Sequence, residues 1–186
     1  MIDKVYISHS EEDESIAQEL ANVLWAVNLE SFCCLYRKAQ ALSQAEIMRF
    51  GIHHSDCVVP ILSRRGIASP RVNQEIGLAI GFDSLIIPLL EESMVLPLLI
   101  RHLHPIIFSR DAYEDALGRL IETLRQLTKL EWLKIKCPYC GEEMTQYITS
   151  QEDVDRALVS GKALDTMCSY CESVLSLDPR TFQPII

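Results

Sequence analysis

The fold of this chain is decided between residues 55 and 90, where the sequence reads SDCVVPILSRRGIASPRVNQEIGLAIGFDSLIIPLL. Two short apolar runs, at 57–62 and 84–90, have the length and composition of buried β-strands. Between them lie apolar residues at the spacing of one helix face, namely Val72, Ile76, Ala79 and Ile80. A strand, a helix and a second strand in this order predict a βαβ unit with parallel strands.

The same alternation continues on both sides of this unit. Further apolar runs at 4–8, 31–36 and 104–108 predict strands, and amphipathic segments near 16–27, 43–53 and 117–130 predict helices. Ser10 and Asp13 predict the N-cap of the first helix. The expected fold class is therefore α/β, a flavodoxin-like, doubly wound, five-stranded parallel sheet. Pro60 and Pro88 fall inside predicted strands and indicate a bulge or a weak segment there.

Composition excludes several classes of protein. The chain has 186 residues, of which 48% are hydrophobic and 23% charged, with a formal net charge of −9. Phosphate backbones are bound by clustered Lys and Arg, so this acidic balance argues against nucleic acid as the main ligand. Glu91, Glu92, Pro97 and Arg101 interrupt the most apolar region, which excludes a membrane-spanning segment. The opening residues MIDKVYISHS lack the apolar core of an export signal, so we expect a cytoplasmic protein.

Glu75 is the residue of the decisive stretch that calls for an explanation. At 100° per residue it falls at the edge of the predicted apolar helix face. A glutamate in such a place is most often a surface residue. The alternative is a functional carboxylate that faces a cleft, and the helix pattern alone leaves both interpretations open.

Two segments together resemble a known family. VYISHSEEDESIAQELANVL near the start, and the stretch 55–90 with its Ser69-Pro70 pair six residues before Glu75, are similar to the corresponding parts of TIR domains. The resemblance covers residues 3 to about 128. It implies a flavodoxin-like domain and, for many members, cleavage of NAD+ into nicotinamide and linear or cyclic ADP-ribose in stress or antiviral signalling. By the same resemblance Glu75 is expected to be catalytic, and homo-oligomers through TIR–TIR contacts are expected.

Five further residues are expected to border the substrate. Ligands of open α/β sheets bind outside the carboxyl ends of the strands, which indicates Ser8, His9 and Ser10, and the resemblance adds Tyr36 in the loop after the second strand. Arg71 stands where many TIR domains have an aromatic residue, and we expect it to bind substrate phosphates or to be a solvated residue of the helix start.

A single carboxylate suits this chemistry. Nicotinamide leaves NAD+ as a neutral molecule, so no general acid is needed, and the carboxylate stabilises the positive charge that develops on the ribose. Two other classes of function stay open: a non-enzymatic TIR adaptor that acts through protein contacts, and a sensor that binds NAD+ without cleaving it.

The C-terminal segment has a different character. It contains two C-x-x-C pairs separated by 27 residues, with the cysteines Cys137, Cys140, Cys168 and Cys171. Four thiolates complete the shell of a structural zinc ion, whereas a redox C-P-Y-C motif needs a thioredoxin-like fold that the remaining chain is too short to form. We therefore predict a TIR domain at 1–133 and a zinc-ribbon-like module at 134–186.

The charge of this module bears on its partners. From residue 136 onward four Lys or Arg stand against eight Asp or Glu, so a protein partner is expected rather than nucleic acid. The other cysteines, Cys33, Cys34 and Cys57, are expected to be small buried hydrophobic residues.

Overall fold

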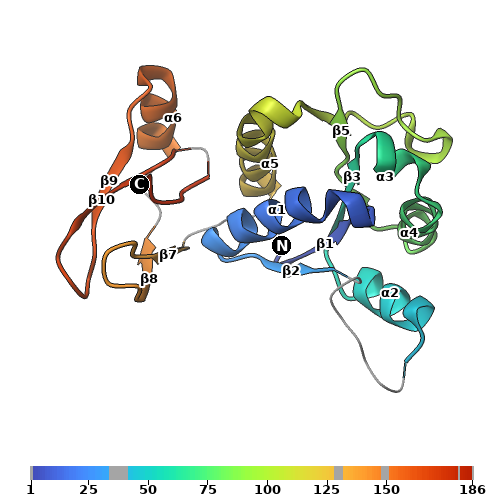
Figure 1. The fold of residues 1–186 in the computed structure, drawn as a ribbon, viewed down its shortest axis with the longest axis horizontal. Coiled ribbons are helices and arrows are strands. Elements are labelled where there is room, and N and C mark those ends of the chain that lie inside the picture. The colour runs from blue at the N-terminus through green and yellow to red at the C-terminus, as the bar shows by residue number, and fades with distance from the viewer. Residues whose placement is uncertain (1, 34–41, 128–131, 148–150, 180, 186) are drawn as a thin grey trace.

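The computed structural model describes residues 2–33, 42–127, 132–147, 151–179 and 181–185. The N-terminal two thirds form an open sheet with helices on both faces (Figure 1). The strands are β1 (Lys4–Ser8), β2 (Glu30–Phe32), β3 (Cys57–Leu62), β4 (Leu85–Ile86), β5 (Leu89–Glu91) and β6 (Ile106–Phe108). All pairs are parallel and the spatial order is β2-β1-β3-β5-β6, with β4 also paired to β3. The predicted doubly wound parallel sheet is confirmed.

The predicted strand at 84–90 is interrupted at Ile87 and Pro88. Both halves keep one register against β3, because Val58 pairs with Ile86 and Ile61 pairs with Leu89. The same offset places Pro88 opposite Pro60, and neither proline has an N–H to donate. The interruption therefore has a local cause, and the halves act as one strand position in the sheet.

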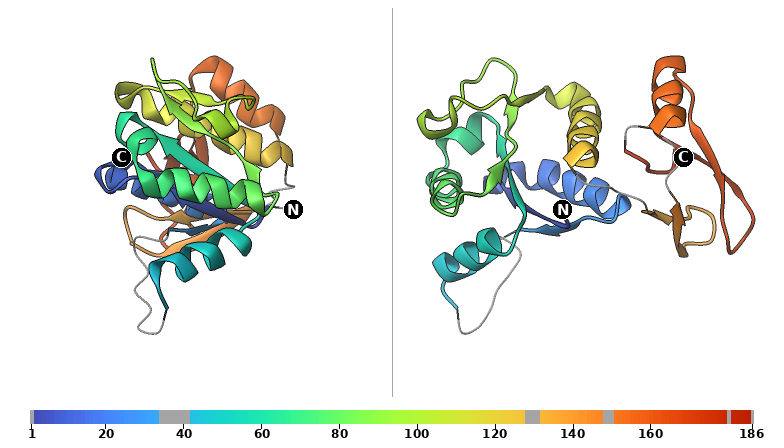
Figure 2. Two further views of the ribbon diagram at one scale, coloured as in Figure 1. Left: turned by 90° about the vertical axis from the view of Figure 1, so that its right-hand side faces the viewer. Right: turned by 180° about the vertical axis from the view of Figure 1, so that it is seen from behind.

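Helices cover both faces of this sheet (Figure 2). The helices are α1 (Glu14–Ala26), α2 (Gln44–His53), α3 (Arg64–Ala68), α4 (Pro70–Gly81) and α5 (Tyr113–Leu127), with short 3-10 turns at Glu11–Asp13, Leu98–Ile100 and Arg110–Ala112. Side chains of β1 alternate between the faces. Val5 and Ile7 belong to the core that α1 and α5 cover, whereas Tyr6 packs with α2 and α4. Ser8 shares the face of Tyr6 by the same alternation.

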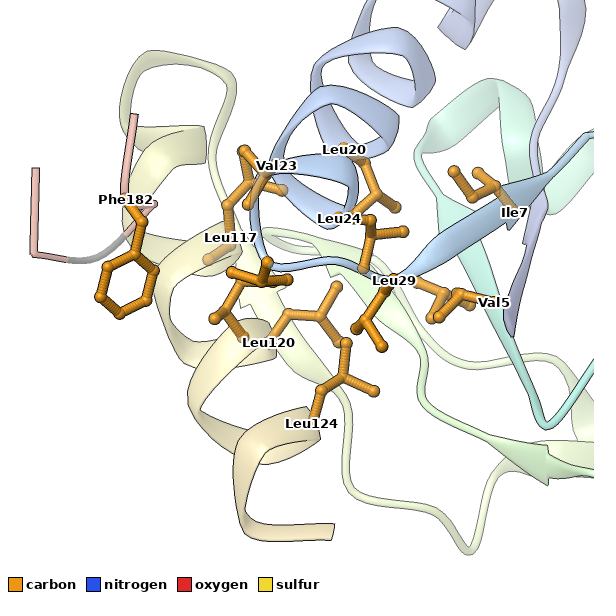
Figure 3. Close-up of a cluster of buried hydrophobic side chains, with 14 of the residues drawn as sticks. Val5, Ile7, Leu20, Val23, Leu24, Leu29, Leu117, Leu120, Leu124 and Phe182 are labelled. Carbon is orange, nitrogen blue, oxygen red and sulfur yellow. The ribbon is translucent and has the colours of Figure 1, made fainter. Parts of the chain in front are cut away.

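The larger core lies between the sheet, α1 and α5 (Figure 3). Leu20 and Leu24 of α1 and Leu120 of α5 are fully buried against it. Burying such side chains stabilises the fold by about 1.5–3 kcal/mol each, so this core alone holds the sheet and both helices together.

The C-terminal segment consists of two small antiparallel hairpins and one helix. β7 (Trp132–Lys136) pairs with β8 (Glu143–Tyr147), and β9 (Leu164–Met167) pairs with β10 (Val174–Leu177), with α6 (Gln151–Ser160) between them. Phe182 is buried beside α5, where the Arg125 guanidinium lies 5.2 Å from the centre of its ring (Figure 3). Buried residues of the segment thus join the larger core. The division at 133/134 stays a prediction.

Three local expectations were wrong. The strand predicted at 31–36 ends at Phe32 within the described residues, and Ile80, expected in the core, is 41% exposed. The Ser10 side chain does not cap a helix; instead it donates a hydrogen bond to the Asp13 carboxylate.

In the part of the chain that the structure describes, no helix is both long and apolar enough to cross a membrane.

Candidate functional site

The candidate site lies at the carboxyl edge of the sheet, where β1 ends and α4 begins. Ser69 caps α4 by accepting a hydrogen bond from the Val72 N–H, and Pro70 occupies the first turn. Because α4 returns antiparallel to the strands, its first turn sits at this edge and its second turn lies deeper. Arg71 is therefore near the rim, and Glu75, one turn further along, lies beneath it.

Glu75 is buried, with 1% of its surface exposed, and this corrects the expectation that it lies at the edge of the helix face. Tyr6 Oη donates a hydrogen bond of 2.9 Å to Glu75 Oε1, and Ser8 Oγ donates one to Glu75 Oε2. Both donors come from β1, at positions two residues apart. Strand alternation thus presents two hydroxyl groups to one carboxylate.

Burial has the largest effect on the pKa of Glu75. Loss of hydration raises the pKa of Glu75 above its ordinary value, and the hydrogen bonds from Ser8 and Tyr6 and the charge of Arg71 oppose that rise. A carboxylate that keeps hydrogen-bond donors inside a low-dielectric pocket acts strongly on any nearby positive charge. Ser8, Tyr6 and Arg71 are therefore the groups that favour the ionised form, in which Glu75 could stabilise a cation.

Arg71 is the charged neighbour of Glu75. Its Nε lies 3.6 Å from Glu75 Oε1, and its Nη2 donates a hydrogen bond to the His9 carbonyl oxygen. The side chain is 25% exposed, yet its Nε is buried and makes no hydrogen bond. A buried N–H without an acceptor is costly, so the guanidinium is held near the carboxylate by charge rather than by a well-formed hydrogen bond.

A hollow of about 340 Å³ borders Arg71 at the start of α4. Its lining includes Arg71, Arg65 and the cap residue Ser69 from the start of α3 and α4, and Ser10 from the loop after β1. Glu11 and Glu12 complete the polar side, and Glu75 is not part of the lining. Arg71 is thus the lining residue that also contacts the Glu75 carboxylate.

His9 is buried between the end of β1 and β2. Its Nδ1 lies 2.6 Å from the Ser10 carbonyl oxygen, and its Nε2 lies 3.0 Å from Cys33 Sγ. Burial lowers the pKa of His9. A neutral ring that donates from Nδ1 and accepts at Nε2 satisfies both contacts, so His9 fixes the backbone whose carbonyl binds Arg71.

A second buried acid, Asp13, organises the same edge of the sheet. It accepts hydrogen bonds from Ser10 Oγ and Ser63 Oγ, both at 2.6 Å, and Arg110 Nη2 lies 3.0 Å from its other oxygen. Arg110 also binds Glu91 at the end of β5. These contacts tie together the segments at the carboxyl ends of β1, β3, β5 and β6, and they include Ser10, which lines the hollow.

The structure brings most of the predicted site residues together. Ser8, His9, Ser10, Arg71 and Glu75 share one edge of the sheet, whereas Tyr36 lies outside the described residues. Tyr6 and the Asp13–Arg110 pair were not predicted. Tyr6 was detectable as the residue two positions before Ser8 on one strand face. The Asp13–Arg110 pair, 97 residues apart, had no signal in the sequence.

The four cysteines form a candidate metal centre in the C-terminal segment. Their sulfur atoms all lie within 4.8 Å of one another. Cys137 Sγ lies 3.7 Å from Cys171 Sγ, and Cys140 Sγ lies 3.8 Å from Cys168 Sγ. A tetrahedral zinc site with Zn–S bonds of about 2.3 Å has edges of about 3.8 Å. The sulfur positions therefore fit a zinc ion, and they are too far apart for disulfides.

The two cysteine turns have the same backbone design. In each turn the first cysteine N–H donates to the carbonyl five residues on, from Cys137 to Glu142 and from Cys168 to Ser173. The residue after the second cysteine returns a hydrogen bond to the first cysteine carbonyl. That residue is Gly141 in one turn and Glu172 in the other, and both have positive φ, of 77° and 58°.

Comparison with protein families gives one match. A family model described as a TIR domain matches residues 5–121, which includes every strand of the sheet and most of α5. No curated protein matches the sequence.

Solved structures similar to this chain share its fold. The TIR domain of the Toll-related receptor TRR-2 from Hydra magnipapillata is 19% identical, covers 67% of this chain and 99% of its own, and superimposes with a TM-score of 0.56. The CMP N-glycosidase BcmB of Clostridium botulinum is 20% identical, covers 63% of this chain and 98% of its own, and has a TM-score of 0.50. At these identities the likeness establishes the fold alone.

Proposed function

The chain belongs to the TIR domain family, and on that premise we propose that it is an NAD+ glycohydrolase with Glu75 as its catalytic carboxylate. The reaction breaks the bond between the ribose C1′ and the nicotinamide nitrogen. The bonding electrons leave with nicotinamide, which becomes neutral, and the ribosyl cation is captured by water that loses a proton, or by an internal nucleophile. The products are nicotinamide and ADP-ribose or a cyclic isomer.

The observation that carries this proposal is the position of Glu75. It is an acid buried at the carboxyl edge of a parallel sheet, held by Tyr6 and Ser8, and in contact with Arg71, which lines a polar hollow. Ligands of such sheets bind at this edge. A fixed carboxylate there is complementary to the positive charge that develops on the ribose, and it needs no reorganisation as the charge forms.

The structural similarity to an N-glycosidase supports the proposal that this fold can cleave an N-glycosidic bond, and it does not identify the substrate. BcmB is named for cleavage of the N-glycosidic bond of CMP, and its fold is the one seen here. A sheet of this kind therefore accommodates cleavage of bonds between a ribose and a nitrogen base. The choice of NAD+ rests on the family resemblance and on the polar character of the hollow.

For the C-terminal segment we propose a structural zinc ion bound by Cys137, Cys140, Cys168 and Cys171. The sulfur separations support this assignment. Four thiolates leave no open coordination position, so the metal would stabilise the segment and take no part in the reaction. The exposed tyrosines of the two turns, Tyr139 and Tyr170, offer a surface for a protein partner.

The test is nicotinamide release from NAD+ by concentrated protein, followed by chromatography. The Glu75→Gln variant keeps the size of the side chain and one carbonyl acceptor for Tyr6, so the fold is retained. We expect the variant to lose at least about 100-fold of the rate, which is the scale for removing one electrostatic group from an active site. Equal rates for wild type and Glu75→Gln would contradict the proposal and favour a non-enzymatic adaptor.

A further inference from the structure

We propose that Arg71 is a latch on Glu75 that the 5′-phosphate of the substrate releases, so that the site acts on nicotinamide nucleotides and discriminates against the unphosphorylated nucleoside. This inference rests on the proposed function, because it concerns the same carboxylate. It assigns to Arg71 two alternative partners, the carboxylate in the free protein and a phosphate in the complex.

The free protein shows the latched arrangement. Arg71 Nε lies 3.6 Å from Glu75 Oε1, and Arg71 lines the hollow, whereas Glu75 does not. A substrate that enters the hollow therefore meets the arginine first. For the ribose to approach the carboxylate, the guanidinium must move away from it.

One N–H of Arg71 is left for a ligand. Its Nε is a buried nitrogen without a hydrogen-bond partner, and among the described residues it is the one such side-chain atom. The ion pair is thus imperfect in the free protein. A phosphate group presents several acceptor oxygens to the planar fork of a guanidinium, and it would satisfy the N–H that Glu75 leaves unmet.

A nicotinamide nucleotide carries a negative phosphate, which suits Arg71, and a positive nicotinamide, which suits Glu75. The phosphate is on C5′ of the ribose and the cationic nicotinamide is on C1′, so one sugar carries a negative and a positive group at opposite ends. Arg71 and Glu75 are four residues apart on α4, a rise of about 6 Å along the axis. Moving the guanidinium to the phosphate leaves the carboxylate free to face the developing cation, and no charge is left unpaired during the exchange.

Other charged groups around the hollow favour Arg71 as the phosphate ligand. Glu11 and Glu12 lie on the side formed by the loop after β1 and repel an anion, whereas Arg71 and Arg65 lie on the side formed by α3 and α4. Arg71 is the one of the two arginines that also contacts Glu75. It is the residue through which an anion in the hollow affects the carboxylate.

The experiment compares nicotinamide mononucleotide with nicotinamide riboside, which contain the same scissile bond and differ in one phosphate. For wild type we expect kcat/KM to favour the mononucleotide by about 10- to 100-fold, the value of one or two charge-assisted hydrogen bonds. In Arg71→Gln, which keeps the three-carbon part of the side chain and removes the charge, we expect the preference to fall below about 3-fold. Arg64→Ala removes the same charge from an exposed position outside the hollow and should leave the preference unchanged.

A binding measurement separates this inference from the proposed function. Glu75→Gln removes the countercharge of Arg71, so calorimetry should show the mononucleotide bound about 10-fold more tightly than by wild type, with riboside affinity unchanged. The double variant Glu75→Gln/Arg71→Gln should lose this gain. These results support the latch even if no variant releases nicotinamide, an outcome that would overturn only the glycohydrolase proposal. An unchanged preference in Arg71→Gln, or equal mononucleotide affinity in wild type and Glu75→Gln, would overturn the latch.

Discussion

The sheet domain and the C-terminal segment use polar residues for opposite purposes. In the sheet domain, apolar burial between the strands, α1 and α5 holds the fold, and the buried acids Asp13 and Glu75 are gathered at one edge. In the C-terminal segment two short hairpins bury a smaller set of apolar side chains, and the sulfur atoms of four cysteines lie within 4.8 Å of one another. Where the apolar core is large enough to hold the fold, polar groups are available for chemistry. Where the core is small, polar groups such as the four thiolates are expected to support folding.

Removal of the proposed zinc ion should give the largest difference between the two regions. Structural zinc in small modules contributes about 10–16 kcal/mol of apparent binding free energy, which is also folding free energy. We expect a strong chelator, or Cys168→Ala, to abolish hydrogen-exchange protection in β7 to β10 while β1 and β3 keep theirs.

The contrast between the two regions is the control in that experiment. Amide protection in the sheet domain reports on a fold that needs no metal, in the same sample. Retained protection of β9 and β10 in metal-free protein would contradict the structural role of the four thiolates.

Asp13→Ala should destabilise the sheet domain by roughly 3 kcal/mol. The change leaves two buried hydroxyls, Ser10 and Ser63, without their acceptor and removes the partner of Arg110. Urea unfolding checks this value. Glu12→Ala removes the same charge from an exposed neighbour and should change stability by less than about 0.5 kcal/mol. A similar loss in both variants would show that net charge, rather than the buried network, is responsible.

Glu75 should make the stability of the sheet domain depend on pH. Burial raises the pKa of Glu75 in the folded state, so the folded protein binds this proton more tightly than the unfolded chain does. The favourable contribution is complete below the unfolded pKa and is lost as pH rises through the folded value.

Glu75→Gln cannot titrate and is the control for this pH dependence. We expect its free energy of unfolding, relative to wild type, to increase as pH rises from about 4.5 and then to level off. Parallel curves for the two proteins would show that Glu75 has the same pKa in both states. The measurement is independent of any catalytic activity.

The smallest expected effects are two opposite changes in stability at equivalent positions of the two cysteine turns. Gly141 and Glu172 occupy equivalent positions with positive φ, which costs a residue with a Cβ about 1 kcal/mol. Glu172→Gly should therefore stabilise the metal-bound segment by about that amount, and Gly141→Ala should destabilise it equally, since no atom lies within 4 Å of the added Cβ. Competition with a zinc indicator measures both. Changes of the same sign would contradict the equivalence of the turns.

Local patterns in the sequence predicted much of this structure, and long-range polar contacts explain what they missed. The apolar runs located β1, β3 and β6, and the C-x-x-C spacing indicated the cluster of four cysteines, because both are local features. The burial of Glu75 was not predictable from its own helix, since the hydroxyls that make burial tolerable come from β1, 67 and 69 residues away. The pairing of Asp13 with Arg110 has the same origin.

The alternation of β1 joins the register of the sheet to the chemistry of the site. Tyr6 and Ser8 face the acid only because they share a parity, and a shift of one residue would replace both hydroxyls with Val5 and Ile7. A misaligned strand would thus bury Glu75 against hydrocarbon and, under the proposed function, would also abolish activity. Under the proposed function, the rate of the reaction would therefore depend on the correct register of β1. One residue inserted into β1 would disrupt folding and activity together.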